Sequence, residues 1–268
     1  MINLKRRLLH REHVSKINCS LTQQPLISVV TVVLNNVNLL EETILSIINQ
    51  TYKNIEYLLI DGGSVDGTLK IIQKYEEEID FWVSEPDKGI YDAMNKALKI
   101  AKGDFLIFMN SGDILYSDDT LSRFANSISN LDAIYYGNAI YKDRLNKENS
   151  LRGGIFNKYR LSKTNICHQT IFFSRKAYKS NFYNLKYNLF ADWAYNIALF
   201  RKYNYKYIDQ IIAYYDANGK SKFNKDLNFE RDQKITILKN LGFDAILYLI
   251  ANKLINLISD CFVSNTSR

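Results

Sequence analysis

The chain has 268 residues, of which 47% are hydrophobic, and this is enough for one large α/β domain, with or without appendages, around a sizeable core. With only 2 prolines and 11 glycines, the composition excludes a disordered or low-complexity protein. The formal net charge of +7 favours anionic partners, which include nucleic acid, phosphorylated substrates and an acidic membrane surface.

The termini and the cysteines narrow the cellular setting. Cys19, Cys167 and Cys261 lie far apart without metal-type spacing, which predicts reduced thiols in a cytosolic protein. The charged N-terminus lacks an apolar stretch, so no signal peptide is expected. No run of roughly 18 apolar residues exists, so no segment is expected to span a membrane. Residues 1–24 are basic and predict an extension that is either frayed or in contact with anionic lipid or another subunit.

Strands and helices are predicted to alternate four times in the first part of the chain. The apolar, β-branched run 27–34 predicts a strand buried on both faces, and the apolar spacing over 38–50 predicts a helix capped by Asn38. Further strands are predicted at 55–60, 81–83 and 105–109, and further helices at 68–75 and 91–101. Gly103 is expected just past the end of the last of these helices. This alternation indicates a mostly parallel sheet with a ligand site at the carboxyl ends of its strands.

The second part of the chain is less regular. Its predicted strands are 133–141, 169–173 and 208–215, and its predicted helices are 192–202 and 229–241. The segment 243–262 mixes apolar runs with asparagines and charges, which is typical of an interfacial helix. Packing against the domain or against a second subunit is the alternative for this segment.

Polar turns follow two of the early strands and precede a helix. Asp61 leaves a strand into a turn of small residues, where it can accept hydrogen bonds from a base or ribose, and Asp66 can brace the turn or cap the next helix. Gly62-Gly63 lacks the Gly-Lys-Ser/Thr ending of a phosphate loop. Lys88 stands just before a helix start, where a cation suits an anionic diphosphate.

Carboxylates occur at two further places that suit chemistry. Asn110-Ser111-Gly112-Asp113 follows an apolar strand, and a carboxylate there can bind a hard divalent cation when substrate phosphates complete its shell. Asp192 begins a later helix, where an acidic residue is either a cap or a functional group. His168, which precedes a predicted strand, is either structural or functional.

The order of these motifs carries more information than any one of them. They run from Val32-Val33-Leu34-Asn35 through the turn 60–68 and the segment 85–95 to the turn 109–113. This series resembles glycosyltransferase family 2, and within it the bacterial enzymes of O-antigen, capsule and exopolysaccharide synthesis. The resemblance is strong over 27–120. It is weaker over 165–220, where the matching motifs are Cys167-His168-Gln169, Ala191-Asp192 and Asn218-Gly219-Lys220-Ser221.

The resemblance implies an α/β protein with the GT-A fold. That fold has a Rossmann-like, mostly parallel central sheet with flanking helices, here followed by a C-terminal amphipathic helical segment. We therefore expect the basic extension 1–24, a catalytic domain over 25–225 and a C-terminal, membrane-associating segment over 226–268. Within the domain, 25–120 would bind the nucleotide-sugar and 121–225 the acceptor.

The resemblance also implies roles for single residues. Asp192 would be the general base, and Asp113 would hold the Mg²⁺ or Mn²⁺ that bridges the donor phosphates. Asp61 would hydrogen-bond the uracil. The other donor-binding residues would be Val32, Val33, Leu34, Lys88, Asn95, Asn110 and Ser111, and the acceptor-side residues would be His168, Gln169 and Trp193.

The implied activity is inverting, non-processive transfer from a UDP-hexose or UDP-N-acetylhexosamine to a lipid-diphosphate-linked saccharide. The expected location is the cytoplasmic face of the bacterial inner membrane, on its anionic surface, with a homodimer left open. Processive members carry a Gln-x-x-Arg-Trp motif that is not found after Asp192. The main alternative is a catalytically degenerate nucleotide-sugar-binding protein. A sugar-phosphate nucleotidyltransferase lacks support because no Gly-rich loop follows the first strand, and no motif supports nucleic-acid binding.

Overall fold

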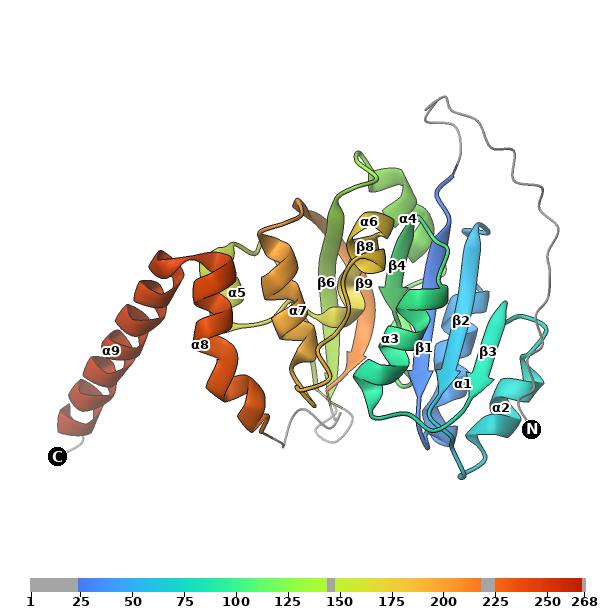
Figure 1. Cartoon of the computed structure of the whole chain (residues 1–268), viewed down its shortest axis with the longest axis horizontal. Helices are drawn as coiled ribbons and strands as arrows, with labels where there is room; N and C mark the ends of the chain where they lie inside the picture. The colour runs from blue at the N-terminus through green and yellow to red at the C-terminus, as the bar shows by residue number, and fades with distance from the viewer. Residues whose placement is uncertain (1–23, 144–147, 218–224, 267–268) are drawn as a thin grey trace.

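The computed structural model describes residues 24–143, 148–217 and 225–266, which form a sheet with helices on both faces (Figure 1). The sheet has nine strands in the order β3-β2-β1-β4-β8-β6-β9-β5, and β7 pairs with β6. The basic extension and the motif at 218–221 lie outside the described residues, apart from Gln24 at the end of that extension.

The first part of the chain folds as predicted into parallel βαβ units. The strands β1 (Ile27–Val33), β2 (Ile55–Asp61), β3 (Phe81–Ser84) and β4 (Phe105–Phe108) pair in parallel. The helices between them are α1 (Val37–Ile48), α2 (Thr68–Lys74) and α3 (Ile90–Ile100).

Burial on both faces explains why these strands are continuous apolar runs. Every residue of β1 is buried, and its side chains alternate between two cores. Val29 and Val33 face the core covered by α1, α2 and α4 (Thr120–Ser127), whereas Val30 and Val32 face the core covered by α3. Each fully buried aliphatic side chain contributes about 1.5–3 kcal/mol, so the register of β1 and the position of its end are strongly fixed.

The second part of the sheet is mixed. β8 (Ile171–Ser174) lies antiparallel to β4, and the remaining strands continue outward from it. They are β6 (Ile134–Asp143), β9 (Tyr205–Asp216), β5 (Ile114–Leu115) and β7 (Glu148–Arg152). The strand predicted at 169–173 starts later, because His168–Thr170 form a 3₁₀ turn, η1, that Thr170 closes on the carbonyl of Cys167.

Several short elements have no counterpart among the predicted ones, because they are too brief to show a period. They are β5, β7, α4, α5 (Lys158–Lys163) and α6 (Arg175–Lys179).

Two predicted details are wrong. Asn36, not Asn38, stands at the N-cap of α1, and its side chain makes no capping bond. Gly103 is not the residue that ends α3, whose cap is Ala101. A Cβ at Gly103 would collide with the backbone of Ser28 and Phe105, so glycine is needed there for close approach of the chain.

Three helices close the molecule. α7 (Ala191–Phe200) contacts α8 (Leu227–Leu241), whose Phe229 and Ile237 are buried in the same core as α3, so the predicted C-terminal segment begins inside the domain. α9 (Phe243–Thr266) follows α8 and extends away from the body (Figure 1). Within the described residues, no helix combines the length and the apolar character that crossing a membrane requires.

Candidate active site

Hydrogen bonds tie together the turns that follow β1, β2 and β4. The Asn36 side chain donates to the carbonyl and the hydroxyl of Ser111, at 3.1 and 3.0 Å. The Asn36 backbone donates to the hydroxyl of Thr68 at 3.0 Å. The three turns therefore meet at the carboxyl edge of the parallel strands, which is where ligands bind in open α/β sheets.

Asp61 shapes this edge from within. Its side chain is fully buried and accepts hydrogen bonds from the backbone of Gly63 and Ser64 and from the hydroxyls of Ser64 and Ser84. These four donors occupy the carboxylate, so the expected direct bond to uracil does not fit. Asp61 instead holds the shape of the turn 62–64.

The exposed surface at the ends of β1 and β2 comes from neighbouring residues. Leu34 is 46% exposed at the end of β1, whereas Val32 and Val33 are buried in the two cores and support it from behind. A Cβ on Gly62 would lie 3.3 Å from the Leu34 side chain and 2.5 Å from the Asp87 carboxylate. Leu34, Gly62 and Asp87 thus form one small surface at the strand ends. Asp87 lies in the segment 85–95, which carries part of the family resemblance. The sequence alone does not single it out, because an aspartate in a turn is common for local reasons.

The two predicted donor-binding residues around α3 differ. Lys88 is exposed, and its ammonium group makes no bond or ion pair within the described residues. Asn95 is buried, and its amide bonds both the N–H and the carbonyl of Tyr183, at 2.8 and 3.0 Å. Asn95 therefore fastens α3 to the segment before α7, and the expected contact with the donor does not fit.

Asp113 is a clamp between three parts of the chain. It is only 5% exposed. One carboxylate oxygen accepts the backbone N–H of Asp216, and the other accepts the side-chain amide of Gln169, both at 2.8 Å. These bonds join the turn after β4 to the end of β9 and to η1. Gln169, which was expected to contact the acceptor sugar, is itself buried.

The expected metal ligand does not fit this geometry. A divalent cation bound with donor phosphates needs accessible carboxylate oxygens, and those of Asp113 are buried and already accept protein hydrogen bonds. In the part of the chain that the structure describes, no group of three or more His, Cys, Asp or Glu side chains is arranged to hold a metal. Asn110 and Ser111 lie half-buried beside Asp113, and the side-chain oxygen of Asn110 is buried without a partner.

Two predicted acceptor-side residues, His168 and Trp193, make their contacts within the protein. His168 is buried, stacks on Phe108 with ring centroids 5.0 Å apart, and bonds the Tyr183 hydroxyl at 2.8 Å. Burial lowers the pKa of His168, which keeps the ring neutral. Trp193 donates to the carbonyl of Leu161 at 2.8 Å and packs on Phe229, so its indole faces the helices rather than an open site.

Asp192 differs from Asp61 and Asp113, which are buried, because it stays partly exposed. It lies in the first turn of α7, where the helix dipole favours a negative charge. The Tyr91 hydroxyl lies 2.9 Å from one of its oxygens, and the Asn165 amide donates to the other at 2.8 Å. Asp192 is not the N-cap residue of α7; that position is held by Phe190, whose side chain makes no capping bond. A carboxylate that is accessible, oriented and held by two donors is suited to accept a proton.

Tyr91 and Asn165 were missed as site residues. Tyr91 lies in the recognised segment 85–95, but an aromatic residue in an amphipathic helix predicts core packing. Asn165 precedes the Cys167-His168-Gln169 motif and has no sequence signal of its own. Only the fold brings them to Asp192, from which Tyr91 is 101 residues distant in sequence.

The sheet and its strand-end site define an α/β enzyme with the GT-A fold, and comparison with known proteins identifies the family. The family model described as Glycosyl transferase family 2 matches residues 28–208. A PGL/p-HBAD biosynthesis glycosyltransferase of Mycobacterium tuberculosis is 32% identical over 234 residues, which cover 84% of this chain and 90% of the relative. The chain therefore belongs to glycosyl transferase family 2, and it is a glycosyltransferase.

Solved structures agree on the fold. Staphylococcus aureus TarS in complex with UDP has a TM-score of 0.62 at 19% identity, covering 80% of this chain and 66% of that one. The mannosyltransferase PcManGT of Pyrobaculum calidifontis, in complex with GDP-Man and Mn²⁺, has a TM-score of 0.59 at 14% identity, covering 88% and 82%. The predicted fold class is thereby confirmed.

Proposed function

We propose that this glycosyltransferase transfers one sugar per encounter, with inversion, from a UDP-hexose or UDP-N-acetylhexosamine to a lipid-linked saccharide. The observation that carries the proposal is the Asp192 carboxylate, which is accessible and held by Tyr91 and Asn165. In inverting transfer the acceptor hydroxyl loses its proton as it attacks, and one positioned carboxylate takes that proton. Asp192 is assigned that role.

The donor side follows from the strand-end surface. Leu34 and Gly62 offer a flat, partly apolar surface for the nucleoside, and Asp87 can accept hydrogen bonds from it. Lys88 is the neighbouring cation, so we place the diphosphate beside its ammonium group, where it offsets the charge that develops on the leaving group. The UDP bound in the TarS structure supports a uridine nucleotide.

A divalent ion supplies charge neutralisation to a leaving diphosphate when one is bound. Asp113 does not fit as its ligand. The roles assigned to Asp192 and Lys88 do not involve such an ion. Asp113 contributes instead by holding the turn 110–113 in place.

We propose a lipid-linked acceptor used at the cytoplasmic face of the bacterial inner membrane, in surface polysaccharide or glycolipid synthesis. The mycobacterial relative is named for PGL/p-HBAD biosynthesis, which supports a glycolipid acceptor. On α9, Phe243, Leu247, Ile250 and Leu254 are exposed and follow one another at intervals of four, three and four residues. That spacing forms a single apolar stripe that suits a membrane interface.

The test of the function combines a donor screen with one substitution. The full chain is incubated with UDP-glucose, UDP-galactose and their N-acetyl forms, with a short lipid-diphosphate sugar as acceptor, and products are identified by mass spectrometry. Asp192→Asn should lower turnover by about 10²–10⁴-fold without weakening UDP binding. Near-normal turnover of this variant would show that Asp192 is not the base. A wild-type chain that binds UDP but makes no product with any donor would favour the degenerate binding protein.

A further inference from the structure

We propose that Tyr91 is a positioning residue for the reaction: its hydroxyl, together with the Asn165 amide, holds the Asp192 carboxylate in one orientation. The inference rests on the proposed function, in which Asp192 accepts the proton of the acceptor. It assigns a chemical task to an aromatic side chain that its sequence pattern places in the core.

Three separate parts of the chain converge on this carboxylate. Tyr91 comes from the first turn of α3, Asp192 from the first turn of α7, and Asn165 from the segment between α5 and η1. Each oxygen of Asp192 has one of these donors, at 2.9 Å from Tyr91 and 2.8 Å from Asn165. With both oxygens held, the carboxyl group cannot rotate freely about its bond to Cβ.

The Tyr91 hydroxyl can only act as a donor here. Its two polar neighbours are the carbonyl of Leu189 and the Asp192 carboxylate, at 2.6 and 2.9 Å; both are acceptors, and they share its single hydrogen. Burial, followed by the nearby charge of Asp192, raises the pKa of Tyr91 well above its ordinary value. Tyr91 therefore keeps its proton at any working pH, and it cannot replace Asp192 as the base.

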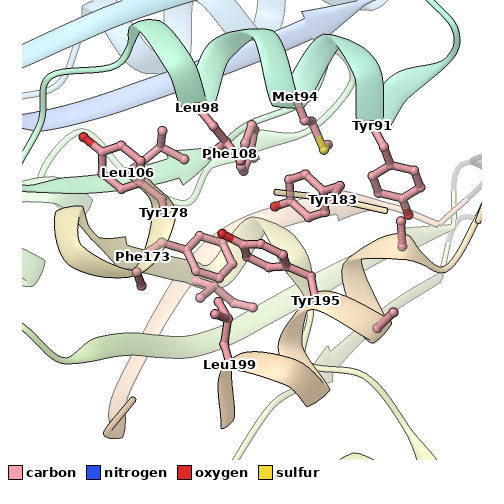
Figure 2. Close-up of a cluster of buried hydrophobic side chains, with 14 of the residues drawn as sticks. Tyr91, Met94, Leu98, Leu106, Phe108, Phe173, Tyr178, Tyr183, Tyr195 and Leu199 are labelled. Carbon is pink, nitrogen blue, oxygen red and sulfur yellow. The ribbon is translucent and has the colours of Figure 1, made fainter. Parts of the chain in front are cut away.

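Packing fixes the donors before substrate binds. Tyr91 is 8% exposed, and its ring lies 5.4 Å from that of Tyr183. Figure 2 shows Tyr91, Tyr183 and Tyr195 in the cluster between α3 and α7. Asn165 is fixed in turn by Asn196, whose amide donates to its side-chain oxygen at 2.8 Å. Donors held in this way lose little freedom when they stabilise the carboxylate.

The other titratable groups near Asp192 are neutral or are bonded elsewhere. His168 is neutral because burial lowers its pKa, and burial raises the pKa of the Cys167 thiol to about 12. Burial likewise keeps the Tyr183 hydroxyl protonated by raising its pKa. Asp226 faces the Leu189–Phe190 backbone, from which it accepts two hydrogen bonds. Within the described residues Asp192 has no ion-pair partner, so the hydrogen bonds from Tyr91 and Asn165 are what hold its carboxylate.

The position of Tyr91 also links the two halves of the site. It lies three residues after Lys88, on the helix that begins at the donor side. The same short segment therefore carries the proposed diphosphate contact and the donor that holds the base.

The experiment compares Tyr91→Phe with Tyr195→Phe. Tyr195 belongs to the same aromatic cluster, but its hydroxyl bonds the carbonyl of Asn181 and not Asp192. The kcat and KM of each full-length variant are measured with the most active UDP-sugar and the lipid-diphosphate sugar acceptor, and UDP binding is measured by calorimetry. Losing a donor frees the carboxylate to rotate away from the acceptor hydroxyl, so kcat should fall while UDP affinity stays the same.

For Tyr91→Phe we expect a roughly tenfold loss of kcat, with unchanged KM for the UDP-sugar and unchanged UDP affinity. Tyr195→Phe should leave kcat unchanged. A folded Tyr91→Phe enzyme with the wild-type kcat would overturn the inference. If Tyr91→Phe does not fold, Asn165→Ala provides the same test, because it removes the other donor and should lower kcat in the same way.

The outcome is separable from that of the proposed function. If Asp192→Asn is inactive and Tyr91→Phe keeps the wild-type kcat, only the positioning role fails. If Asp192→Asn remains active, the assignment of the base fails first.

Discussion

The side-chain amide of Gln169 donates to the Asp113 carboxylate at 2.8 Å, and this bond connects the turn after β4 to η1 across the sheet. Both residues are buried. Asp113, the expected metal ligand, and Gln169, an expected acceptor contact, are thus bonded to each other inside the protein. It also places η1, with His168, between the donor-side turns and the segment that holds Asp192.

Removing Asp113 should therefore destabilise the protein even without metal. Asp113→Ala leaves the Gln169 amide and the Asp216 N–H without this acceptor, and each buried unpaired group costs about 1–3 kcal/mol. We expect the free energy of unfolding, measured by urea titration in EDTA, to fall by about 2–4 kcal/mol. Asp118→Ala, at an exposed turn, is the control and should change it by less than about 0.5 kcal/mol. A fully stable Asp113→Ala protein would instead favour a role in metal binding.

Lys88 should affect donor binding and leave stability unchanged. Its ammonium is exposed and has no protein partner within the described residues, so Lys88→Ala removes only the proposed diphosphate contact. We expect the KM for the UDP-sugar to rise about tenfold, with less effect at high salt because the attraction is screened. Lys88→Arg should retain most of the affinity. Lys70→Ala, which removes an exposed cation on α2, should leave KM unchanged, and an equal rise in that control would mean that only the overall charge matters.

Gly62 should be sensitive to a single methyl group. The Cβ of Gly62→Ala would lie 2.5 Å from the Asp87 carboxylate, which must then move away from its bond to the N–H of Gly89. Because Asp87 is the end of a flexible side chain, we expect little change in melting temperature but roughly tenfold weaker UDP binding by calorimetry. Normal UDP binding by Gly62→Ala would place the nucleoside elsewhere.

The apolar stripe of α9 should govern membrane binding. Leu247→Glu/Ile250→Glu is expected to abolish flotation of the full chain with vesicles containing phosphatidylglycerol, because two charges would enter the interface. Leu131→Glu/Leu151→Glu adds the same charge at exposed leucines outside α9 and should still float. If the wild-type chain does not float, and light scattering shows a dimer that only the α9 variant dissociates, the stripe serves a second copy.

The parallel part of the sheet and the order of the site motifs can be predicted from the sequence. Strands such as β1 are buried on both faces, so their sequences are continuous apolar runs that end in polar residues. A strand end of this kind is visible locally, so the edge that carries the ligand site was predictable, as was Asp192 at the start of α7. The short elements of the second half were not predictable because they lack a period.

Which polar residues stay accessible at the strand ends depends on the tertiary structure. Asp61, Asp113 and Asp192 are all aspartates within sequence motifs, but the exposure of each side chain depends on partners from elsewhere in the chain. Asp113 is clamped by residues 56 and 103 positions away, and Asp192 is held by one that is 101 positions away. Such distant pairs leave no local pattern, because a carboxylate satisfied by protein donors and one left accessible to substrate have the same neighbours in sequence.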